Sequence, residues 1–471
     1  MRWKVEHVHF IGIGGIGMSG IAEVLLNLGY RVSGSDLKES EFTTRLSAQG
    51  AEIYYRHHPD QVKGADVVVV SSAVREDNPE VQAAHTRGLP VIPRAEMLAE
   101  LMRMKNGIAI AGAHGKTTVT SMVAIVLQAA GWDPTAVIGG RLNTFGSNAR
   151  LGTGEWIVAE ADESDGTFLK LRPMLAVVTN IDREHMDHYR EFSHLENAFV
   201  EFINSVPFYG LSVVCADCPV IKKILPRVSR PHLTYGEGED AEFRAVQIGS
   251  ESGGCHFTAL KGREELGRVK LGMPGRHNAL NALASIVVGL ELEIGFTTIA
   301  RALEGFRGIH RRFEIKAVAK EAVIVDDYAH HPTEIQATIR AAREWMAPAY
   351  FSKAKPERVI CVFQPHRYSR TQDLKEEFIH AFDEADILIL TEIYSAGEEP
   401  RHGITGEWLY DAIKKGTRNE RLRIEFISNR EDIPARLAGL IEKGDLILTM
   451  GAGNIWQVGD ALLEILGGEG N

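Results

Sequence analysis

The sequence predicts an α/β protein of three domains built on largely parallel sheets. Its 471 residues correspond to about three domains of average size. Short apolar runs alternate with helical patterns along most of the chain, which is typical of doubly wound sheets. Glycine-rich turns directly follow apolar runs at 12–17, 112–115 and 451–453. Such turns between a strand and a helix are where these folds bind phosphates.

The predicted boundaries fall after residues 104 and 312. Residues 1–104 form an expected Rossmann-like domain, 105–312 a P-loop-type mononucleotide-binding domain, and 313–471 a second Rossmann-like domain. A polar stretch near 230–270 predicts a small β meander in the second domain. The principal strand candidates are Val8–Ile11, Arg31–Ser35, Val67–Val70, Ile108–Ala111, Trp156–Ala161, Ala176–Thr179, Ala322–Val325, Arg358–Phe363, Ile387–Leu390 and Leu446–Thr449.

Composition excludes several classes of function. The net charge is −11, and no basic block stands out, so nucleic acid is not an expected partner. No apolar run approaches the ~20 residues of a membrane span, and the N-terminus does not resemble a signal peptide. We therefore expect a cytoplasmic protein without membrane insertion. The four cysteines favour core thiols, with redox or metal chemistry at Cys215-x-x-Cys218 as the alternative.

The central glycine turn predicts a phosphate-binding loop. Gly112-Ala113-His114-Gly115-Lys116-Thr117, followed by Thr118, joins an apolar run to a helical pattern. Backbone N–H groups at a helix N-terminus attract anions, a lysine there reaches terminal phosphates, and a threonine hydroxyl can ligate magnesium. The spacing differs from the standard Walker motif, because Ile110 stands where the first glycine would be. An ordinary glycine turn before a helix is the alternative.

The N-terminal glycine run fits a pyrophosphate-binding turn. Gly12-Ile13-Gly14-Gly15-Ile16-Gly17 follows a strand candidate, and Asp36 ends the next strand, where an acid meets a ribose hydroxyl. Ser71-Ser72-Ala73 follow a third strand, where small side chains admit the same ligand. NAD and a nucleotide sugar both satisfy this pattern.

A metal site is predicted beside the central loop. Glu160 ends an apolar strand and is expected to ligate magnesium with Thr117. His185 follows another buried strand and has carboxylates as neighbours. An imidazole is an unusual magnesium ligand, so a structural histidine is the alternative. Further acids in this region are Asp162, Glu163 and Asp165.

Polar clusters in the second half of the chain extend the candidate site. His277, Asn278 and Asn281 open a helix whose amides can bond a purine edge, and Arg311-Arg312 can clamp phosphates. Arg367 and Arg370 follow a strand and can bind a carboxylate bidentately. Taken singly, each of these clusters also fits a helix cap or a solvated charge.

Together these motifs resemble the Mur ligase family, ATP-dependent amide-forming enzymes of bacterial peptidoglycan synthesis. The resemblance covers the whole chain, through residues 10–20, 112–118, 160–165, 179–181, 277–281, 311–313, 326–334 and 364–371. The N-terminal glycine run and Asp326–Glu334 favour the member that adds L-alanine to UDP-N-acetylmuramic acid. A member that attaches a preformed peptide shares nearly all phosphate-binding motifs. If the protein were an NAD-dependent oxidoreductase, the central loop would have no role. If it were a nucleotide sensor, the metal ligands would have none.

The resemblance implies a role for each motif. Lys116 would contact the β- and γ-phosphates, Thr117 and Glu160 one magnesium ion, and His185 a second. The implied ATP-binding residues are Gly112, Ala113, His114, Gly115, Lys116, Thr117, Thr118, His277, Asn278, Asn281, Arg312 and Asp327. The implied UDP-sugar residues are Gly12, Gly14, Gly15, Ile16, Gly17, Met18, Ser19, Asp36, Ser71, Ser72, Ala73 and Asn180. The implied alanine-binding residues are Tyr328, His330, Arg367 and Arg370.

One feature departs from related ligases. Several of them have a carbamylated lysine shortly after the metal histidine, whereas no lysine occurs here between Lys170 and Lys222. Acids and substrate phosphate are then expected to support the second metal ion. The expected oligomeric state is a monomer or a weak homodimer.

Overall fold

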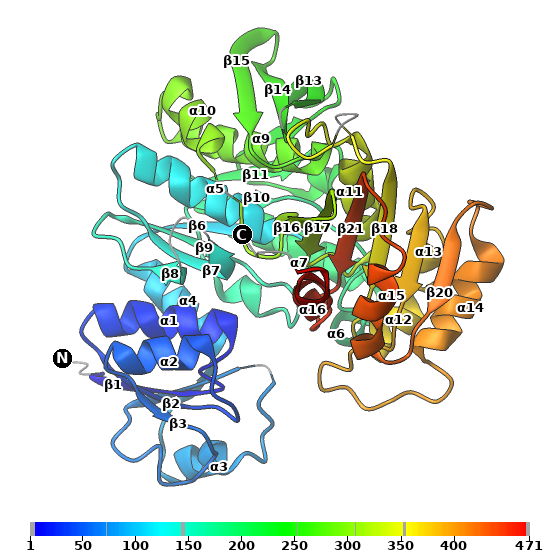
Figure 1. Ribbon diagram of the computed structural model, residues 1–471. Coiled ribbons are helices and arrows are strands. Elements are labelled where there is room, and N and C mark those ends of the chain that lie inside the picture. The colour runs from blue at the N-terminus through cyan, green and yellow to red at the C-terminus, as the bar shows by residue number, and fades with distance from the viewer. Residues whose placement is uncertain are drawn as a thin grey trace. The chain divides into compact units, whose positions relative to one another are not determined.

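The computed structural model describes residues 5–71, 73–142, 147–251, 253–306, 308–351 and 355–467 (Figure 1). The chain divides into two compact units. The N-terminal unit comprises Met1–Arg244, Leu260–Leu266 and Asn281–Leu303; the C-terminal unit comprises Ala245–Ala259, Gly267–Leu280 and Glu304–Asn471. Within the described residues, none of the helices has the length and apolar character needed to cross a membrane.

The first sheet lies in the N-terminal unit and has five parallel strands in the order β3-β2-β1-β4-β5. Its strands are β1 (His7–Ile11), β2 (Arg31–Ser35), β3 (Glu52–Tyr54), β4 (Val67–Val70) and β5 (Val91–Pro93). The helices between them are α1 (Ile16–Asn27), α2 (Glu41–Ala48), α3 (Pro79–Thr86) and α4 (Arg94–Arg103). All five residues of β1 are buried, as expected for a central strand covered on both faces.

The second sheet has the strand order β15-β14-β13-β12-β11-β10-β6-β9-β7-β8. Its strands are β6 (Asn106–Ala111), β7 (Thr135–Leu142), β8 (Ser147–Arg150), β9 (Trp156–Glu160), β10 (Leu175–Val178), β11 (Leu211–Cys215), β12 (His232–Gly236), β13 (Phe243–Glu251), β14 (Gly254–Lys261) and β15 (Glu264–Leu271). The last three form the predicted meander. The α-helices of this part are α5 (Lys116–Ala129), α6 (Met186–Tyr189), α7 (Phe192–Ile203), α8 (Pro219–Ile224), α9 (Arg276–Glu291) and α10 (Phe296–Glu304); η1 (Thr167–Lys170) and η2 (Leu225–Arg227) are short 3₁₀ helices.

The third sheet lies in the C-terminal unit and has the order β16-β17-β21-β18-β19-β20. Its strands are β16 (Glu314–Ala319), β17 (Ala322–Asp327), β18 (Arg358–Phe363), β19 (Ile387–Leu390), β20 (Arg423–Phe426) and β21 (Asp445–Met450). Only β16 pairs antiparallel among these described strands. The helices are α11 (Pro332–Glu344), α12 (Tyr368–Asp373), α13 (Lys375–Ile379), α14 (Gly406–Gly416), α15 (Ile433–Ala438), α16 (Trp456–Leu466) and the 3₁₀ helix η3 (Arg430–Asp432).

Alternate residues of the third sheet enter two separate cores. Val359 and Cys361 belong to one apolar cluster, whereas Ile360 and Val362 belong to the other. Side chains of a strand alternate between the two faces of its sheet, so both faces are covered. Cys361 is one of four free cysteines, three of which are buried. The predicted fold class is confirmed: α/β, with three sheets and the meander.

Parallel pairing brings three predicted segments to one edge of the second sheet. Strand β6 lies between β9 and β10 and runs parallel to both. The carboxyl ends of all three strands therefore meet at the same edge. The loop after Ala111, the carboxylate of Glu160 and the residues after Val178 begin there, and the candidate site is built on them.

Candidate functional site

The loop between β6 and α5 requires glycine at two positions. Gly112 has φ +132° and Gly115 has φ +83°, which L side chains rarely adopt. A Cβ atom on Gly112 would lie 2.1 Å from the Thr179 hydroxyl oxygen, and one on Gly115 would lie 2.6 Å from the Asn281 Oδ1 atom. Neighbouring polar side chains therefore leave no space for a side chain at these two positions of the loop. Lys116 then begins α5, so that backbone N–H groups at this end are available to an anion.

The segment after β10 fixes the shape of this loop. The Asn180 side chain accepts a hydrogen bond from His114 N–H (2.8 Å) and donates one to the His114 carbonyl (3.0 Å). The Thr179 hydroxyl donates to the same carbonyl at 2.6 Å. The His114 ring lies 3.0 Å from an Asp182 carboxylate oxygen. Asn180 thus supports the phosphate loop, and its expected contact with the UDP-sugar stays a prediction.

Lys116 is held at the mouth of the loop by a buried carboxylate. Its ammonium lies 2.9 and 3.0 Å from the two Glu163 oxygens and donates to the Gly112 carbonyl at 2.6 Å. Burial acts to lower the pKa of Lys116, but the Glu163 and Asp162 carboxylates outweigh it and raise that pKa above its ordinary value. Burial in turn raises the pKa of Glu163. The direction of the Lys116 shift favours the protonated, cationic form of this side chain.

A group of possible metal ligands lies around the same carboxylate. One ligand atom each of Glu163, Glu184 and His185 falls within 4.8 Å of the others. His185 Nε2 lies 3.7 Å from Glu163 and 3.6 Å from Glu184. His185 has φ +58° as the residue that caps α6, a backbone conformation that is uncommon for non-glycine residues. Two carboxylates fit magnesium, which prefers oxygen ligands, and the imidazole is the less usual member.

Glu160 and Thr117 lie at the ends of elements that flank the loop. Glu160 is the last residue of β9 and pairs in register with Ile110 of β6. Thr117 is in the first turn of α5 and is 8% exposed. Both positions match the predicted edge of the sheet. Their joint binding of one magnesium ion stays a prediction.

The N-terminal glycine run folds around Asp36. Gly14 N–H donates to Asp36 Oδ2 at 2.8 Å, and a Cβ atom on Gly14 would lie 2.8 Å from that oxygen. Gly12 has φ +82°, and a Cβ atom there would lie 3.0 Å from the Ser71 hydroxyl. Ser71 thus lies beside the run, as predicted. Met18 and Ser19 are buried in α1, which begins at Ile16. Ala73 is exposed, and Ser72 lies outside the described residues.

An arginine that the sequence did not single out connects the two loops of the N-terminal unit. A Cβ atom on Gly17, in the first turn of α1, would lie 2.7 Å from Arg94 Nη1. Arg94 Nη2 donates to Asp162 Oδ2 at 2.9 Å. Asp162 directly precedes Glu163, the partner of Lys116. Arg94 therefore places a positive charge beside the glycine run and ties it to the acids next to the phosphate loop.

The helix α9 contributes to both units. In the N-terminal unit, the Asn281 amide lies against Gly115, as described above. In the C-terminal unit, Asn278 donates from its amide to the Pro274 carbonyl at 2.8 Å. Burial, reinforced by Arg312, lowers the pKa of His277 to about 4. His277 is therefore neutral near pH 7 and able to accept a hydrogen bond.

Asp327 ends β17 in the C-terminal unit. It accepts hydrogen bonds from Phe313 N–H (2.7 Å) and Ala329 N–H (2.8 Å). Burial raises its pKa to about 6, although Arg312 and these hydrogen bonds oppose the shift. Arg312 lies 3.6 Å from Glu334 and stacks over the Tyr328 ring at 5.2 Å. Arg312 and Asp327 thus share one polar neighbourhood at the carboxyl end of a strand.

Three of the four predicted alanine-binding residues lie in one chain of contacts. The rings of Tyr328 and His330 are 5.4 Å apart, those of His330 and His366 are 5.9 Å apart, and Arg370 lies 3.2 Å from His366 Nδ1. His366 also stacks on Tyr394 at 5.6 Å. Burial, with His330 and Arg370, lowers the pKa of His366 to about 3. Arg367 has φ +72° and donates its backbone N–H to the Tyr394 carbonyl, so the fourth residue is on the same loop.

Three successive parts of the chain match models of one protein family. Residues 7–106 match the model described as Mur ligase family, catalytic domain; 110–289 match the Mur ligase middle domain, and 311–453 the Mur ligase, glutamate ligase domain. The chain belongs to the Mur ligase family. These three matches together extend over most of its length.

Individual Mur ligases resemble the chain from end to end. It is 54% identical over 463 residues to the UDP-N-acetylmuramate–L-alanine ligase of Geobacter sp. (strain M21), covering 98% of both chains. The Myxococcus xanthus protein of the same name is 53% identical, over 98% of this chain and 96% of its own. The crystal structure of UDP-N-acetylmuramate–alanine ligase from Thermotoga maritima matches with a TM-score of 0.81, 29% identity and 98% coverage of both chains. A murein peptide ligase from Psychrobacter arcticus matches with a TM-score of 0.69, 25% identity and 98% coverage of both.

Several members of this Mur ligase site were not in the predicted set. Glu163 and Glu184 were visible only as acids near the predicted metal residues, without an indication of which one faces Lys116. Arg94 begins α4 with no motif around it. His366 directly precedes the predicted Arg367, and its position next to a pair of arginines was the available indication.

Proposed function

We propose that this Mur ligase joins L-alanine to the lactyl carboxylate of UDP-N-acetylmuramic acid in peptidoglycan precursor synthesis, with hydrolysis of ATP to ADP and phosphate. The observation that carries the proposal is 54% identity, over 98–100% of the chain, to ligases of that name. The phosphate loop with Lys116 supports it independently. A nicotinamide oxidoreductase has no use for this loop or for the ligand group around Glu163.

The reaction requires activation of a carboxylate. One lactyl carboxylate oxygen attacks the γ-phosphorus of ATP, and the bond to the β–γ bridging oxygen breaks, giving an acyl phosphate and ADP. The neutral amine of L-alanine then attacks the acyl carbon. The tetrahedral intermediate expels phosphate, which retains the former carboxylate oxygen, and the amine proton is lost. No covalent bond to the protein is needed, so alignment and charge neutralisation provide the catalysis.

Lys116 has the central part in this scheme. In our proposal its ammonium, which contacts Glu163 in the structure, neutralises the β- and γ-phosphates of ATP. The attacking carboxylate and the γ-phosphate are both anions, so this cation lowers their mutual repulsion. The loop residues Gly112, Ala113, His114, Gly115, Thr117 and Thr118 supply the anion-binding turn and helix start.

Magnesium, when bound, neutralises phosphate charge and orients the phosphates for in-line transfer. In our proposal Thr117 and Glu160 hold one ion, and His185 holds a second with help from Glu163 and Glu184. The carboxylates provide the hard oxygen ligands that this ion prefers. They also take the place of the carbamylated lysine of related ligases.

The other ligands are assigned by location. The glycine run, from Gly12 to Ser19, together with Asp36, Ser71, Ala73 and Asn180, is proposed to bind the UDP-sugar. His277, Asn278, Asn281, Arg312 and Asp327 are proposed to contact ATP. Tyr328, His330, Arg367 and Arg370 are proposed to bind L-alanine, the arginines through its carboxylate. The domain boundaries after residues 104 and 312, action in the cytoplasm, and a monomer or weak homodimer stay predictions.

The main alternative is a sister ligase that adds a preformed peptide to the same UDP-sugar. The Psychrobacter arcticus murein peptide ligase, with a TM-score of 0.69, shows that this class shares the fold. Phosphate release with ATP, magnesium and UDP-N-acetylmuramic acid distinguishes the two when L-alanine, glycine, L-serine or a tripeptide is added in turn. We expect turnover to be highest with L-alanine; turnover with the tripeptide alone would establish the sister activity instead.

A further inference from the structure

A basic pocket lies at the opposite end of β6 from the phosphate loop. It has a volume of about 410 Å³, and its polar lining includes Arg103, Lys105, Arg172, Ser205, Tyr209 and Arg230. Strand β6 begins beside it at Asn106, and the segments just before β10, β11 and β12 complete the wall. The pocket belongs wholly to the N-terminal unit. The ligation reaction proposed above makes no use of it.

The lining is strongly positive in a protein with a net charge of −11. Four cationic side chains and no carboxylate line the pocket. Arg103 pairs with Glu100 at 2.6 Å. Within the described part of the chain, Lys105, Arg172 and Arg230 have no carboxylate within 4.0 Å. Like charges gathered without counter-charges favour an anionic ligand.

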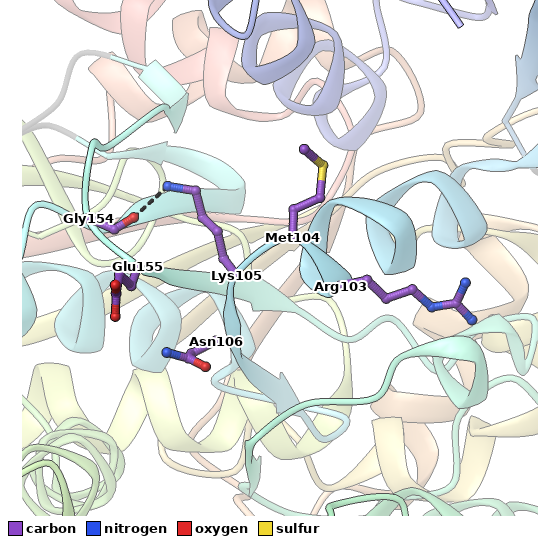
Figure 2. A pocket seen from close by; sticks show the side chains of 6 residues that line it. All are labelled: Arg103, Met104, Lys105, Asn106, Gly154 and Glu155. Carbon is purple, nitrogen blue, oxygen red and sulfur yellow. Dashed lines mark hydrogen bonds between the residues drawn. The ribbon is translucent and has the colours of Figure 1, made fainter. Parts of the chain in front are cut away.

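The Lys105 ammonium is engaged by backbone carbonyls beside this region. An adjoining hollow of about 500 Å³ is lined by Arg103, Lys105 and Gly154 among others. In Figure 2, Lys105 extends toward Gly154 and Arg103 extends the other way. The Lys105 ammonium donates to the carbonyls of Gly152 and Gly154. The arginines are therefore the main groups available to a ligand in the basic pocket.

Unused hydrogen-bond donors remain in the pocket. Within the described residues, Arg172 donates to carbonyls of its own segment only from Nη1, and Arg230 donates to the Asn204 carbonyl only from Nε. The Ser205 hydroxyl oxygen is buried and has no hydrogen-bond partner among the described residues. A buried hydroxyl without a partner costs free energy unless a ligand or water satisfies it. Planar guanidinium groups together with a hydroxyl are well suited to phosphate oxygens.

An exposed aromatic pair borders the same pocket. Phe208 is 76% exposed and Tyr209 67%, and their rings meet edge to face at 4.9 Å. Large apolar side chains at this exposure are available to the carbon part of a ligand whose charged end enters the pocket. The arginines of the pocket thus offer a subsite for an anionic group, and the aromatic pair beside them offers a subsite for an apolar group.

We propose that the basic pocket binds the phosphate of a phosphate-bearing small molecule or lipid headgroup, with Arg172 and Arg230 as its main contacts and Tyr209 against its carbon part. The site is separate from the ATP loop, which occupies the other end of β6. Its occupation is thus independent of the proposed ligase activity.

Binding to the full-length chain tests the proposal. Glycerol 3-phosphate is titrated by calorimetry into the Lys116→Ala protein, in which the ATP loop is weakened, and vesicles of phosphatidylglycerol in phosphatidylcholine are tested by cosedimentation. Arg172→Ala/Arg230→Ala should weaken binding of the preferred probe about tenfold or more, because charge-assisted hydrogen bonds are lost. The matched control is Arg263→Ala/Arg421→Ala, which removes two exposed arginines elsewhere.

The two probes distinguish the possible sources of the phosphate. Arginine-dependent binding of glycerol 3-phosphate identifies a free phosphate compound, and arginine-dependent binding of vesicles alone identifies a headgroup. The proposal is overturned if neither probe distinguishes the pocket variant from its control, or if succinate binds as tightly as glycerol 3-phosphate. An unchanged melting temperature and kcat for the pocket variant in the wild-type background show that the fold and the ligase site are intact.

Discussion

The Lys116 ammonium and the Glu163 carboxylate form a buried ion pair, with separations of 2.9 and 3.0 Å to the two carboxylate oxygens. This pair joins the first residue of α5 to the acidic segment that follows β9. In the function proposed above, a phosphate entering the loop replaces Glu163 as the partner of Lys116. The released carboxylate is then free to bind a cation together with Glu184 and His185. The first two predictions test this exchange.

Removal of the lysine should abolish the chemical step without unfolding the protein. We expect Lys116→Ala to lower kcat at least about 10²–10³-fold, since it removes the main cation facing the transferred phosphoryl group. Phosphate release and the melting temperature measure the two effects. Lys415→Ala, an exposed lysine on α14, is the control. Near-normal turnover by Lys116→Ala would remove the loop from the mechanism.

Neutralising Glu163 should separate nucleotide binding from catalysis. In Glu163→Gln, Lys116 no longer has a competing carboxylate, so ATP measured in the presence of EDTA should bind at least as tightly as to the wild type. With magnesium, kcat should fall, because a charged metal ligand is missing. Calorimetry and steady-state kinetics provide the two readouts. Weaker ATP binding in EDTA would contradict the exchange.

The backbone of the phosphate loop should tolerate no side chain at its first glycine. Gly112→Ala combines φ +132° with a Cβ position 2.1 Å from the Thr179 hydroxyl, so the loop must shift and ATP turnover should be lost. Gly131→Ala is the matched control, because its φ is +80° but nothing lies within 4 Å of the added atom. That variant should lose stability, by about 1 kcal/mol, but keep its KM for ATP. Equal kinetics for both variants would show that loop shape is unimportant.

Arg94 should contribute to binding of the UDP-sugar. Its guanidinium lies beside Gly17 at the start of α1, where a pyrophosphate is expected. Arg94→Ala should raise the KM for UDP-N-acetylmuramic acid about tenfold or more, and the KM for ATP much less. Arg31→Ala, an exposed position at the start of β2, is the control. A larger effect on ATP would place Arg94 in the nucleotide site.

Glu80 should stabilise the first sheet in a pH-dependent manner. Its buried carboxylate accepts hydrogen bonds from His9 (2.8 Å) and Ser35 (2.9 Å) and contacts His57 (2.8 Å). Burial acts to raise the pKa of Glu80, but these hydrogen bonds outweigh it and lower that pKa below 4.5. A carboxyl group whose pKa is lower in the folded than in the unfolded state stabilises the fold above about pH 4.5. This stabilisation is lost as the pH falls through the lowered pKa.

The corresponding variant is Glu80→Gln. We expect it to reduce the free energy of opening of β1 and β2 by about 3 kcal/mol at pH 7, and by less at pH 4. Hydrogen exchange of the amides in these strands, compared with the wild type at each pH, measures the difference. A deficit of the same size at both values would argue against an ionised Glu80 as the source.

The sequence was most informative where structure depends on neighbours along the chain. The phosphate loop, the glycine run and the end of β9 at Glu160 follow from local patterns of glycine, apolar residues and acids. Parallel pairing then brings these strand ends together. The fold class was predictable for the same reason, since alternating strand and helix patterns specify doubly wound sheets.

Contacts between distant residues were not predictable in this way. Lys116 and Glu163 are 47 residues apart, and Arg94 and Asp162 are 68 apart. Nothing in the sequence distinguishes Glu163 from Asp162 and Asp165 as the partner of the lysine. The bond between Asn180 and His114 was also not predicted; it forms because the end of β10 lies directly against the loop that follows β6, and the expected contact of Asn180 with the sugar stays a prediction.

Isotope transfer tests the central claim most directly. UDP-N-acetylmuramic acid labelled with ¹⁸O in its lactyl carboxylate is turned over with ATP, magnesium and L-alanine, and the released phosphate is analysed by mass spectrometry. Activation at the Lys116 loop predicts one ¹⁸O atom in each phosphate, and release of labelled phosphate at least about 10²–10³-fold more slowly from Lys116→Ala. Alanine-dependent turnover that releases unlabelled phosphate would contradict the acyl-phosphate mechanism.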